Sequence, residues 1–460
     1  METKPKRATR DKNIFVLGDD PFNEQHHLRP LSAKYGYNFH SLMAWQDSSA
    51  DSHGVEETLA EARRRLRCFD GSIDGLLVFY DFPVSLLAPI LCAEFELPSP
   101  SVEAVLKCEH KFWSRKLQQE VVPDFVPAFS HLGLDESPRE AWDRLTGEAG
   151  LTAPFWIKPV KGVLGQLAFR VDSLDALRQA MQEADQKVDR FAKPLQVLLD
   201  QINIPLPNFL TKPHALRMFL AEEDVLVPLA CTAEGYRFGG QTHLHGIVDS
   251  VRYPEHSAFH RYQYPSQLPG TVQARIADAS KRVMEHIGFD GGAFNIEYFW
   301  DPQSDRLSLL EINPRISQSH SPQFQMVDGD ANMKVIADLA LGESPQVVHG
   351  EGRFAIAAKI MLRVFAKDAM VTRTPGDADI EAVCQRFPGT LIRPRVQLGQ
   401  QLSEQQHTDS YSWEIAEIYM GADSEEELLS HYNEAVERLD FRLDGAQLEL
   451  PSPEEVTLSS

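Results

Sequence analysis

Two apolar segments that each carry one glutamate constrain the fold of this chain more than any other feature of its sequence. The first, 291–300, contains Glu297, and the second, 309–315, contains Glu311. Both have the apolar content of a strand, and strand side chains alternate between the two faces of a sheet. Glu311 and the residues two and four positions after it are therefore expected to lie on one face.

The residues two and four positions after Glu311 are Asn313 and Arg315. Two carboxylates and an amide oxygen are hard ligands that suit Mg²⁺, and a guanidinium binds phosphate or carboxylate. A glutamate on a strand is usually solvated, but these two lie among Ala, Phe, Ile, Tyr and Leu. Since carboxylates are rarely buried without a partner, the pattern predicts a site for magnesium and phosphate.

A lysine and a glycine-bearing turn precede the acidic strands. Lys158 ends the strand-like segment 155–159, and Gly162 and Gly165 follow in a turn before the next strand. Lysine is a compact charge for phosphate, and glycine lets the backbone approach phosphate closely. The turn lacks the Gly-x4-Gly-Lys-Ser/Thr arrangement, so a P-loop is not expected. Alone it predicts an ordinary hairpin, but together with the acids downstream it indicates a nucleotide site.

Chain length and the order of strands and helices predict several folding units of α/β and α+β type. At 460 residues the chain is long for one domain. A small parallel α/β unit is expected over 1–101, because short apolar strands alternate with helical stretches there. A central unit over 102–345 and an α+β unit over 346–460 follow, the latter with a disordered tail. Within the central unit, the apolar run 195–202 is expected to be a strand.

Composition excludes some classes of function. The formal net charge of -22 argues against nucleic acid as the main partner. Five widely spaced cysteines, with no Cys-x-x-Cys pair, fit a reducing compartment and predict neither a zinc site nor a disulfide framework. No apolar run approaches the about 20 residues that a membrane-spanning helix needs. The expectation is a cytoplasmic protein without a nucleic-acid or membrane partner.

The order of these features resembles that of the ATP-grasp enzymes, the superfamily of carboxylate–amine ligases and biotin carboxylases. An N-terminal α/β unit, a helical lysine at Lys111, the strand lysine Lys158 and the paired acids follow one another in the ATP-grasp order over most of the chain. The resemblance implies an ATP-grasp fold, with a parallel α/β domain before it and an α+β domain after it.

The resemblance also implies roles for individual residues. The residues implied to contact ATP are Lys111, Lys158, Gly162, Gly165 and, as the adenine hinge, Asp200, Gln201 and Ile202. The implied ligands of Mg²⁺, with Mn²⁺ as a substitute, are Glu297, Glu311 and Asn313. The implied catalytic residues are Lys158, which stabilises the transferred phosphoryl group, and Arg315, which holds the substrate carboxylate or its acyl phosphate.

The implied activity is ligation of a small-molecule carboxylate to an amine through an acyl phosphate. A biotin-carboxylase-like enzyme is one alternative; it is disfavoured because Ser319 stands where those enzymes carry a glutamate base. The other alternative is a regulatory ATP-binding protein without catalysis, against which the complete set of acids and lysines argues. Homodimers are common in the family. The sequence leaves open the identity of the substrates, the general base and the oligomeric state. It also leaves open whether substrate contacts His243 and His245 or the loops at 18–20 and 80–81, which follow two N-terminal strands.

Overall fold

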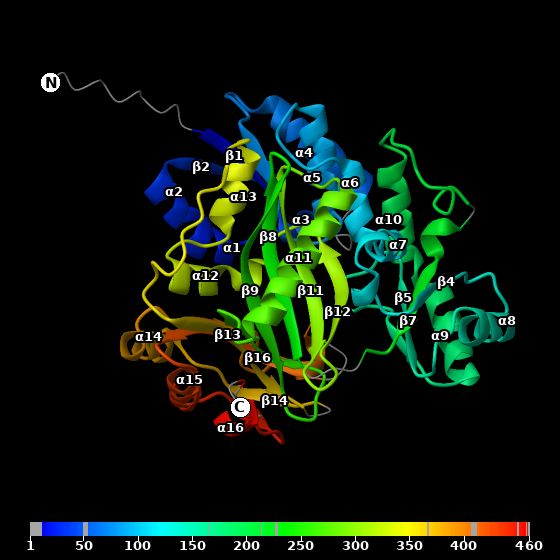
Figure 1. Ribbon diagram of the computed structural model, residues 1–460. Coiled ribbons are helices and arrows are strands. Elements are labelled where there is room, and N and C mark those ends of the chain that lie inside the picture. The colour runs from blue at the N-terminus through cyan, green and yellow to red at the C-terminus, as the bar shows by residue number, and fades with distance from the viewer. Residues whose placement is uncertain are drawn as a thin grey trace.

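The computed structural model in Figure 1 describes residues 12–48, 54–163, 165–212, 214–225, 229–365, 368–405, 412–448, 450–456 and 458. Within these residues the strands form four sheets, of which the largest has eight strands and crosses the centre of the molecule. In the described part of the chain, none of the helices combines the length and the apolar character required to cross a bilayer.

The N-terminal sheet is parallel, as the sequence predicts. Its strands, in spatial order, are β2 (Tyr37–Ala44), β1 (Lys12–Asp19) and β3 (Gly75–Leu77). The central strand is buried over Ile14, Phe15, Val16 and Leu17, which fits a strand covered on both faces. The helical segments of this unit are α1 (Pro21–Asn23), η1 (Glu24–Leu28), α2 (Arg29–Tyr35), α3 (Trp45–Ser48), α4 (Val55–Cys68) and α5 (Val84–Glu94).

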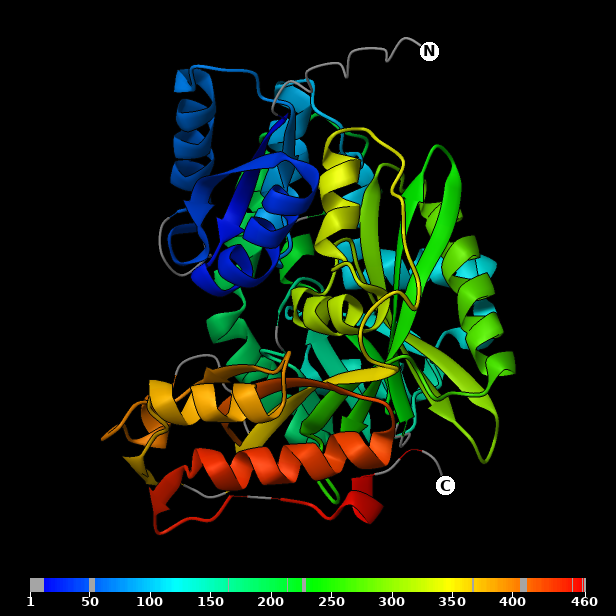
Figure 2. The same ribbon diagram turned by 90° about the vertical axis from the view of Figure 1, so that its left-hand side faces the viewer.

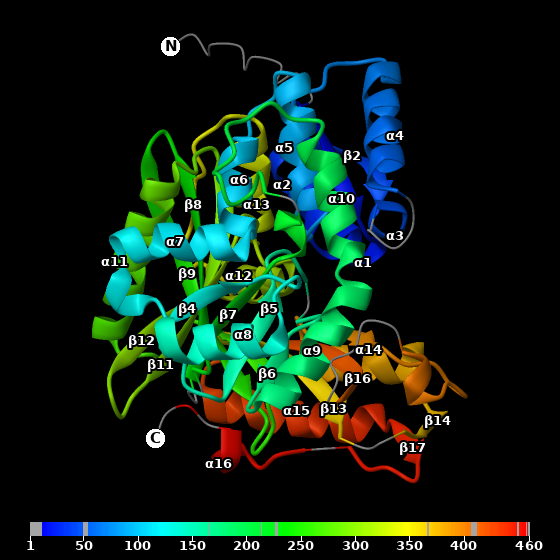
Figure 3. The ribbon, with the colours of Figure 1, turned by 90° about the vertical axis from the view of Figure 1, so that its right-hand side faces the viewer.

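A four-stranded antiparallel sheet lies at one side of the molecule, seen in front in Figure 3. Its strands, in spatial order, are β4 (Phe129–Leu132), β7 (Phe219–Glu223), β5 (Phe155–Pro159) and β6 (Phe169–Val171). The accompanying helical segments are α8 (Pro138–Asp143), η3 (Arg144–Glu148), α9 (Leu174–Lys187), α10 (Asp189–Leu199) and η4 (Ala215–Arg217). The Ser173 side chain caps α9 by accepting from the Ala176 N–H, as its position in the sequence predicts.

The large sheet is antiparallel throughout. Its strands, in spatial order, are β12 (Arg306–Asn313), β11 (Gly292–Asp301), β8 (Leu229–Phe238), β9 (Gln241–Arg252), β10 (Phe259–Tyr264), β13 (Ile356–Val364), β16 (Trp413–Ala422) and β15 (Leu391–Pro394). Because β10 pairs with β13, strands on both sides of the expected boundary at 345/346 form one sheet. The domain limits at 101/102 and 345/346 stay predictions.

Helices cover both faces of the large sheet (Figures 1 and 2). On one face lie α11 (Gly270–Ile287), α14 (Asp377–Arg386) and α15 (Glu425–Leu439). α6 (Val102–Glu109) and α7 (Lys111–Val121) lie along the edge strand β12, to whose backbone carbonyls α7 donates from Arg115. On the other face lie α12 (Ser321–Asp328) and α13 (Met333–Ala340). On β9, the side chain of Ile247 belongs to the core beneath α11, whereas that of Val248 packs with Phe324 of α12. This alternation separates a structural face from a face that is available for chemistry.

Two expectations about local structure are wrong. The run 195–202 is not a strand, because α10 extends to Leu199; its buried residues Phe191, Leu195 and Leu198 recur at helical spacing. The C-terminal tail is not disordered throughout, since it contains the short helix α16 (Pro453–Val456). The Val456 side chain is buried against the core, which explains why this part of the tail is ordered.

The smaller elements complete the described chain. They are η2 (Pro123–Phe125), η5 (Gln318–His320), β14 (Met370–Arg373), η6 (Leu402–Glu404) and β17 (Arg442–Asp444). β14 and β17 pair in a two-stranded antiparallel sheet beside α15.

Candidate active site

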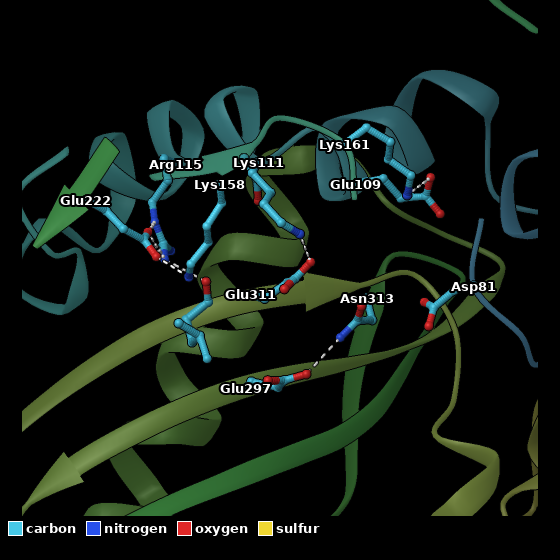
Figure 4. Close-up of polar contacts among 12 residues, drawn as sticks. Asp81, Glu109, Lys111, Arg115, Lys158, Lys161, Glu222, Glu297, Glu311 and Asn313 are labelled. Atoms are coloured by element: carbon cyan, nitrogen blue, oxygen red, sulfur yellow. Dashed lines mark hydrogen bonds and ion pairs between the residues drawn. The ribbon is translucent and has the colours of Figure 1, made fainter. Parts of the chain in front are cut away.

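The predicted acidic set converges where β11 and β12 pair. Glu297 lies directly opposite Glu311, and Asn295 lies opposite Asn313, so that the four side chains share one face of the sheet. The Asn313 amide nitrogen donates to Glu297 Oε1 at 3.3 Å and to Asn295 Oδ1 at 3.0 Å (Figure 4). The hairpin therefore places two carboxylates beside an amide, which is a donor set of the kind that Mg²⁺ takes.

The two carboxylates have different protonation behaviour. Burial, together with the charge of Glu311, raises the pKa of Glu297 to about 7. Burial also acts to raise the pKa of Glu311, but the charge and hydrogen bond of Lys111 outweigh it and hold that pKa below its ordinary value. The pair therefore takes up a proton more readily than two isolated carboxylates do, and a divalent cation bound there would displace that proton.

Lys111 and Lys158 reach this site from two elements above the large sheet. Lys111 is the first residue of α7, and the His110 ring caps that helix by accepting from the Trp113 N–H at 3.2 Å. Its ammonium forms an ion pair with Glu311 (Figure 4). Lys158 projects from β5 and forms an ion pair with Glu222 of β7. Both predicted lysines thus face the acids across one pocket, which Lys111, Lys158 and Glu311 line.

Glu222 and Arg115 belong to the site although the sequence did not single them out. Arg115 Nη2 lies 2.9 Å from Glu222 Oε2, and both side chains are almost completely buried, at 2% and 4% exposed. The same guanidinium donates to the backbone carbonyls of Leu309 at 2.9 Å and Leu310 at 2.6 Å. Burial acts to raise the pKa of Glu222, but Lys158 and Arg115 outweigh it and lower that pKa to about 2. The buried carboxylate of Glu222 on β7 therefore binds Lys158 of β5 and Arg115 of α7. Arg115 in turn connects these elements to the acidic strand β12.

The glycine turn after β5 is anchored by a second buried ion pair. Lys161 Nζ lies 2.8 Å from Glu109 Oε2, and Glu109 also accepts a hydrogen bond from the Ser85 hydroxyl. Gly165 has φ of +68°, a conformation that favours glycine. A Cβ at Gly162 would lie 2.7 Å from the Pro159 ring, so both glycines are required by the path of the chain. Between them, Leu164 lies outside the described residues.

Arg315 is held by the N-terminal unit. Its Nε and Nη2 donate to the two carboxylate oxygens of Asp81, each at 2.8 Å. Burial acts to raise the pKa of Asp81, but Arg315 and Lys161 outweigh it and lower that pKa. Nearby, the Tyr80 hydroxyl donates to Asp20 Oδ2 at 2.9 Å, so the loops after β1 and β3 both approach the site. Asp81 was identified in the sequence only as a residue at the end of a strand.

The residues expected to form the adenine hinge lie elsewhere. Asp200, Gln201 and Ile202 follow α10, which packs against α4 and α9, and Asp200 Oδ1 accepts from Gln196 Nε2 at 2.8 Å. The strand that lines the cleft at this point is β7, which carries Glu222. Because the chain up to Leu199 is helical, these three residues do not stand on a strand beside the acidic hairpin.

The histidines of β9 pack against aromatic rings. His243 stacks on Tyr236 with ring centroids 4.9 Å apart, and His245 stacks on Phe324 at 4.2 Å. Burial lowers the pKa of His245 to about 3, so this ring is neutral at physiological pH. A different histidine, His320, contacts a carboxylate beside the acidic hairpin. Its Nδ1 lies 2.9 Å from Oε1 of Glu234, which lies on β8 opposite Asn295, and both side chains are buried.

Comparison with known sequences identifies part of the chain. Residues 264–346, from α11 to α13 with both acidic strands between, match the family model of the carbamoyl-phosphate synthase L chain, ATP binding domain. The carbamoyl phosphate synthase large chain of Thermotoga maritima is 30% identical over 139 residues, which are 29% of this chain and 12% of that protein. An uncharacterized protein of Sinorhizobium fredii, y4rH, is 22% identical over 312 residues, 66% of this chain and 57% of the relative. The chain thus spans only about an eighth of the carbamoyl phosphate synthase large chains.

Solved structures agree with the fold along nearly the whole chain. The L-amino acid ligase of Bacillus licheniformis has a TM-score of 0.65 at 15% identity, with 94% of this chain and 99% of that one covered. The biotin carboxylase domain of Hydrogenobacter thermophilus 2-oxoglutarate carboxylase was solved with MgADP and bicarbonate. Its TM-score is 0.64 at 15% identity, with 96% of this chain and 92% of that one covered. N5-carboxyaminoimidazole synthase of Aspergillus clavatus was solved with ADP and 5-aminoimidazole ribonucleotide. Its TM-score is 0.60 at 14% identity, with 94% of this chain and 99% of that one covered.

The solved structures show that the chain has the ATP-grasp fold, and the segment matched by the ATP-binding domain model contains the two acidic strands of that fold. Among proteins of that fold, amino acid ligases and biotin carboxylases resemble this chain almost equally. The choice between their activities therefore depends on the residues of the site.

Proposed function

We propose that this chain is an ATP-dependent ligase that joins a small-molecule carboxylate to an amine and releases ADP and phosphate. The observation that carries the proposal is that Lys111, Lys158 and Glu311 line one pocket beside the acidic hairpin of β11 and β12. Cations for phosphates and acids for a metal, on opposite walls of one cleft, are what phosphoryl transfer from ATP requires.

In this proposal Glu297, Glu311 and Asn313 hold Mg²⁺, or Mn²⁺ in its place. The metal would neutralise the transferred phosphoryl group when bound. Lys111 and Lys158 contact the phosphates. Each lysine then interacts with the ligand as well as with its present acidic partner, which is Glu311 for Lys111 and Glu222 for Lys158. The turn that contains Gly162 and Gly165 covers the phosphates with its backbone.

The adenine contact is proposed for the end of β7, in place of Asp200, Gln201 and Ile202. Glu222 and Glu223 end this strand, and β7 pairs with β5, which carries Lys158. A base held there would lie next to the phosphates that Lys158 contacts. The three residues after α10 have no comparable connection with the acidic hairpin among the described residues.

The reaction takes place in two balanced steps. A carboxylate oxygen of the acid attacks the γ-phosphorus of ATP, the bond from that phosphorus to the bridging oxygen breaks, and ADP leaves with the electron pair. The amine nitrogen then attacks the carbonyl carbon, phosphate leaves, and the nitrogen loses a proton to give the amide. Arg315 orients the carboxylate, and because Asp81 already binds its fork in a bidentate manner, the substrate has to share or displace that partner.

The site favours ligation over carboxylation. The position at which biotin carboxylases use a glutamate base is Ser319, whose hydroxyl lies 3.0 Å from that of Ser317. Two hydroxyls do not supply a base at neutral pH. A regulatory role without catalysis would not require the full set of lysines, acids and Arg315 that the structure brings together.

Release of ADP and phosphate from Mg²⁺-ATP tests the proposal. The wild-type chain is incubated with amino acids and small carboxylic acids, each with and without added amines. Release that depends on one acid and one amine, with an amide product found by mass spectrometry, is the expected result. ATP binding without turnover for every pair would favour the regulatory alternative, and turnover that needs bicarbonate and biotin would favour the carboxylase.

A further inference from the structure

A group of charged residues lies on the C-terminal strands of the large sheet. Its members, here called the cationic cluster, are Lys359 and Arg363 of β13, Arg393 of β15, Arg395, and the acids Glu414 and Glu417 of β16. Lys359 Nζ lies 2.6 Å from Glu417 Oε1, and Arg363 Nη2 lies 3.1 Å from Glu414 Oε2. Arg393 Nη1 lies 3.5 Å from Glu417 Oε2, and Arg395 Nε lies 3.7 Å from Glu414 Oε1.

Among the residues that the structure describes, the cluster carries more positive than negative charge. Its four cations there surround two carboxylates, and Arg363 has a further contact besides Glu414, whereas the whole chain has a formal charge of -22. Lys359 and Glu417 are nearly buried, but the side chains of Arg393 and Arg395 are 30% and 36% exposed. A guanidinium has five N–H donors, and one long contact with an acid leaves most of them for another anion. Like charges held this close repel one another, and a bound anion would relieve that repulsion.

The cluster faces the same side of the sheet as the acidic hairpin. Tyr262 of β10 lies opposite Lys359, whose ammonium is 6.0 Å from its ring centre. On the side toward the active site, the Tyr262 ring contacts the ring of His320, with centroids 5.2 Å apart, and His320 in turn contacts Glu234. Burial raises the pKa of the Tyr262 hydroxyl, and the charges of Lys359 and Glu297 both act on it. One tyrosine therefore lies within the electrostatic reach of both groups.

The N-terminal unit contacts the cationic cluster and the segment beside His320. Phe22 of α1 stacks on Tyr419 of β16 at 5.7 Å, and the Arg393 guanidinium lies 5.0 Å from the Phe22 ring centre. The neighbouring Asn23 donates to Gln318 at 3.4 Å, beside His320. In Figure 2 the N-terminal unit lies directly above the C-terminal strands. Asp20 enters from the same loop, and within the described part of the chain the cations of the cluster still outnumber its acids when Asp20 is counted.

We propose that Lys359 and Arg393 bind a second anionic group of the acid substrate, a carboxylate or a phosphate, while Arg315 holds the carboxylate that is activated. The substrate class is thus an acid with at least two negative charges. This inference rests on the proposed ligase activity for the identity of the reacting group, but the anion site itself can be tested without turnover.

Binding is measured first, by calorimetric titration of succinate and of inorganic phosphate into the full chain, with Mg²⁺ and a non-hydrolysable ATP analogue present. We expect one of the two probes to bind the wild type at one site, and Arg393→Gln to weaken that affinity at least 10-fold. Arg393→Lys, which keeps the charge, should recover part of it. The matched control is Arg386→Gln, since Arg386 pairs with Glu434 on the exposed side of α14 and should leave the affinity unchanged. Which probe binds distinguishes a carboxylate from a phosphate as the second group.

Turnover is measured second, with acids that carry one, two or three negative charges. We expect dianionic acids to give the highest kcat/KM for ADP release, and Arg393→Gln to raise their KM at least 10-fold while the KM for ATP stays within twofold. Equal affinities of wild type and Arg393→Gln for both probes, or no binding of either, would overturn the anion site. If no acid supports ADP release but the probes bind as expected, the proposed ligase activity fails and the anion site stands.

Discussion

Glu222 offers the sharpest test of how this site is held together. Its carboxylate is 4% exposed and lies between Lys158 and Arg115, so Glu222→Gln leaves two cations without their shared counter-charge. The pKa of Glu222 falls from its ordinary value of 4.5 to about 2, and this difference corresponds to about 3 kcal/mol of stability at neutral pH. Removing one member of a buried ion pair usually costs roughly 3–5 kcal/mol, which agrees with that value.

The sign of the pH dependence follows from the lowered pKa. The stabilisation by Glu222 is fully present above pH 4.5 and is lost as the pH falls through about 2, because the folded state then has to accept a proton that the unfolded chain accepts more readily. Urea unfolding at pH 7 should therefore show wild type more stable than Glu222→Gln by about 3 kcal/mol, and at pH 3 the difference should be roughly half of that.

The neighbouring residue provides the matched control. Glu223 is 33% exposed and pairs with Arg306 at 2.6 Å on the surface, so Glu223→Gln should cost no more than about 1 kcal/mol. A loss of less than about 1 kcal/mol for Glu222→Gln, or a loss that does not shrink between pH 7 and pH 3, would refute the assignment of Glu222 as the buried counter-ion.

Three further predictions concern the metal, the substrate and the glycine turn. Glu311→Gln should reduce ADP release by at least about 100-fold with little change in urea stability, and normal activity would remove this residue from the metal site. Arg315→Ala should raise the KM for the acid far more than the KM for ATP; equal changes in steady-state assays would assign Arg315 to the nucleotide instead. Lys161→Met should lower the free energy of unfolding by about 3 kcal/mol, because Glu109 keeps its buried charge without a partner. In thermal unfolding, the double variant Lys161→Met with Glu109→Gln should recover much of that stability. Equal losses in both variants would show that the ion pair is not what anchors the turn.

Much of the acidic hairpin could be predicted from the sequence because its geometry is local. Alternation along one strand places Glu311 and Asn313 on one face, and a hairpin partner brings Glu297 opposite them. Glu222 and Arg115 could not be found in this way, because they meet through the pairing of β5 with β7 and the packing of α7 on β12. Such contacts between distant segments have no signature in spacing along the chain.

The errors have equally physical causes. The apolar run 195–202 is too short for its content to distinguish a strand from one side of a helix, and the buried positions before it, from Phe191 onward, show the helical period. The continuity of the large sheet depends on β10 pairing with β13, which lie far apart in the sequence. For the same reason the cationic cluster cannot be recognised before the fold is known.

Two buried ion pairs fix the position of the strand that carries Lys158. Arg115 bonds Glu222 of β7 and the carbonyls of Leu309 and Leu310 in β12, so the two sheets are pinned at that point. Lys161 and Glu109 pin the start of the glycine turn to α6. Lys158 lies on β5, which pairs with β7 at the first of these points and leads into Lys161 at the second, so both ion pairs fix its distance from the acidic hairpin.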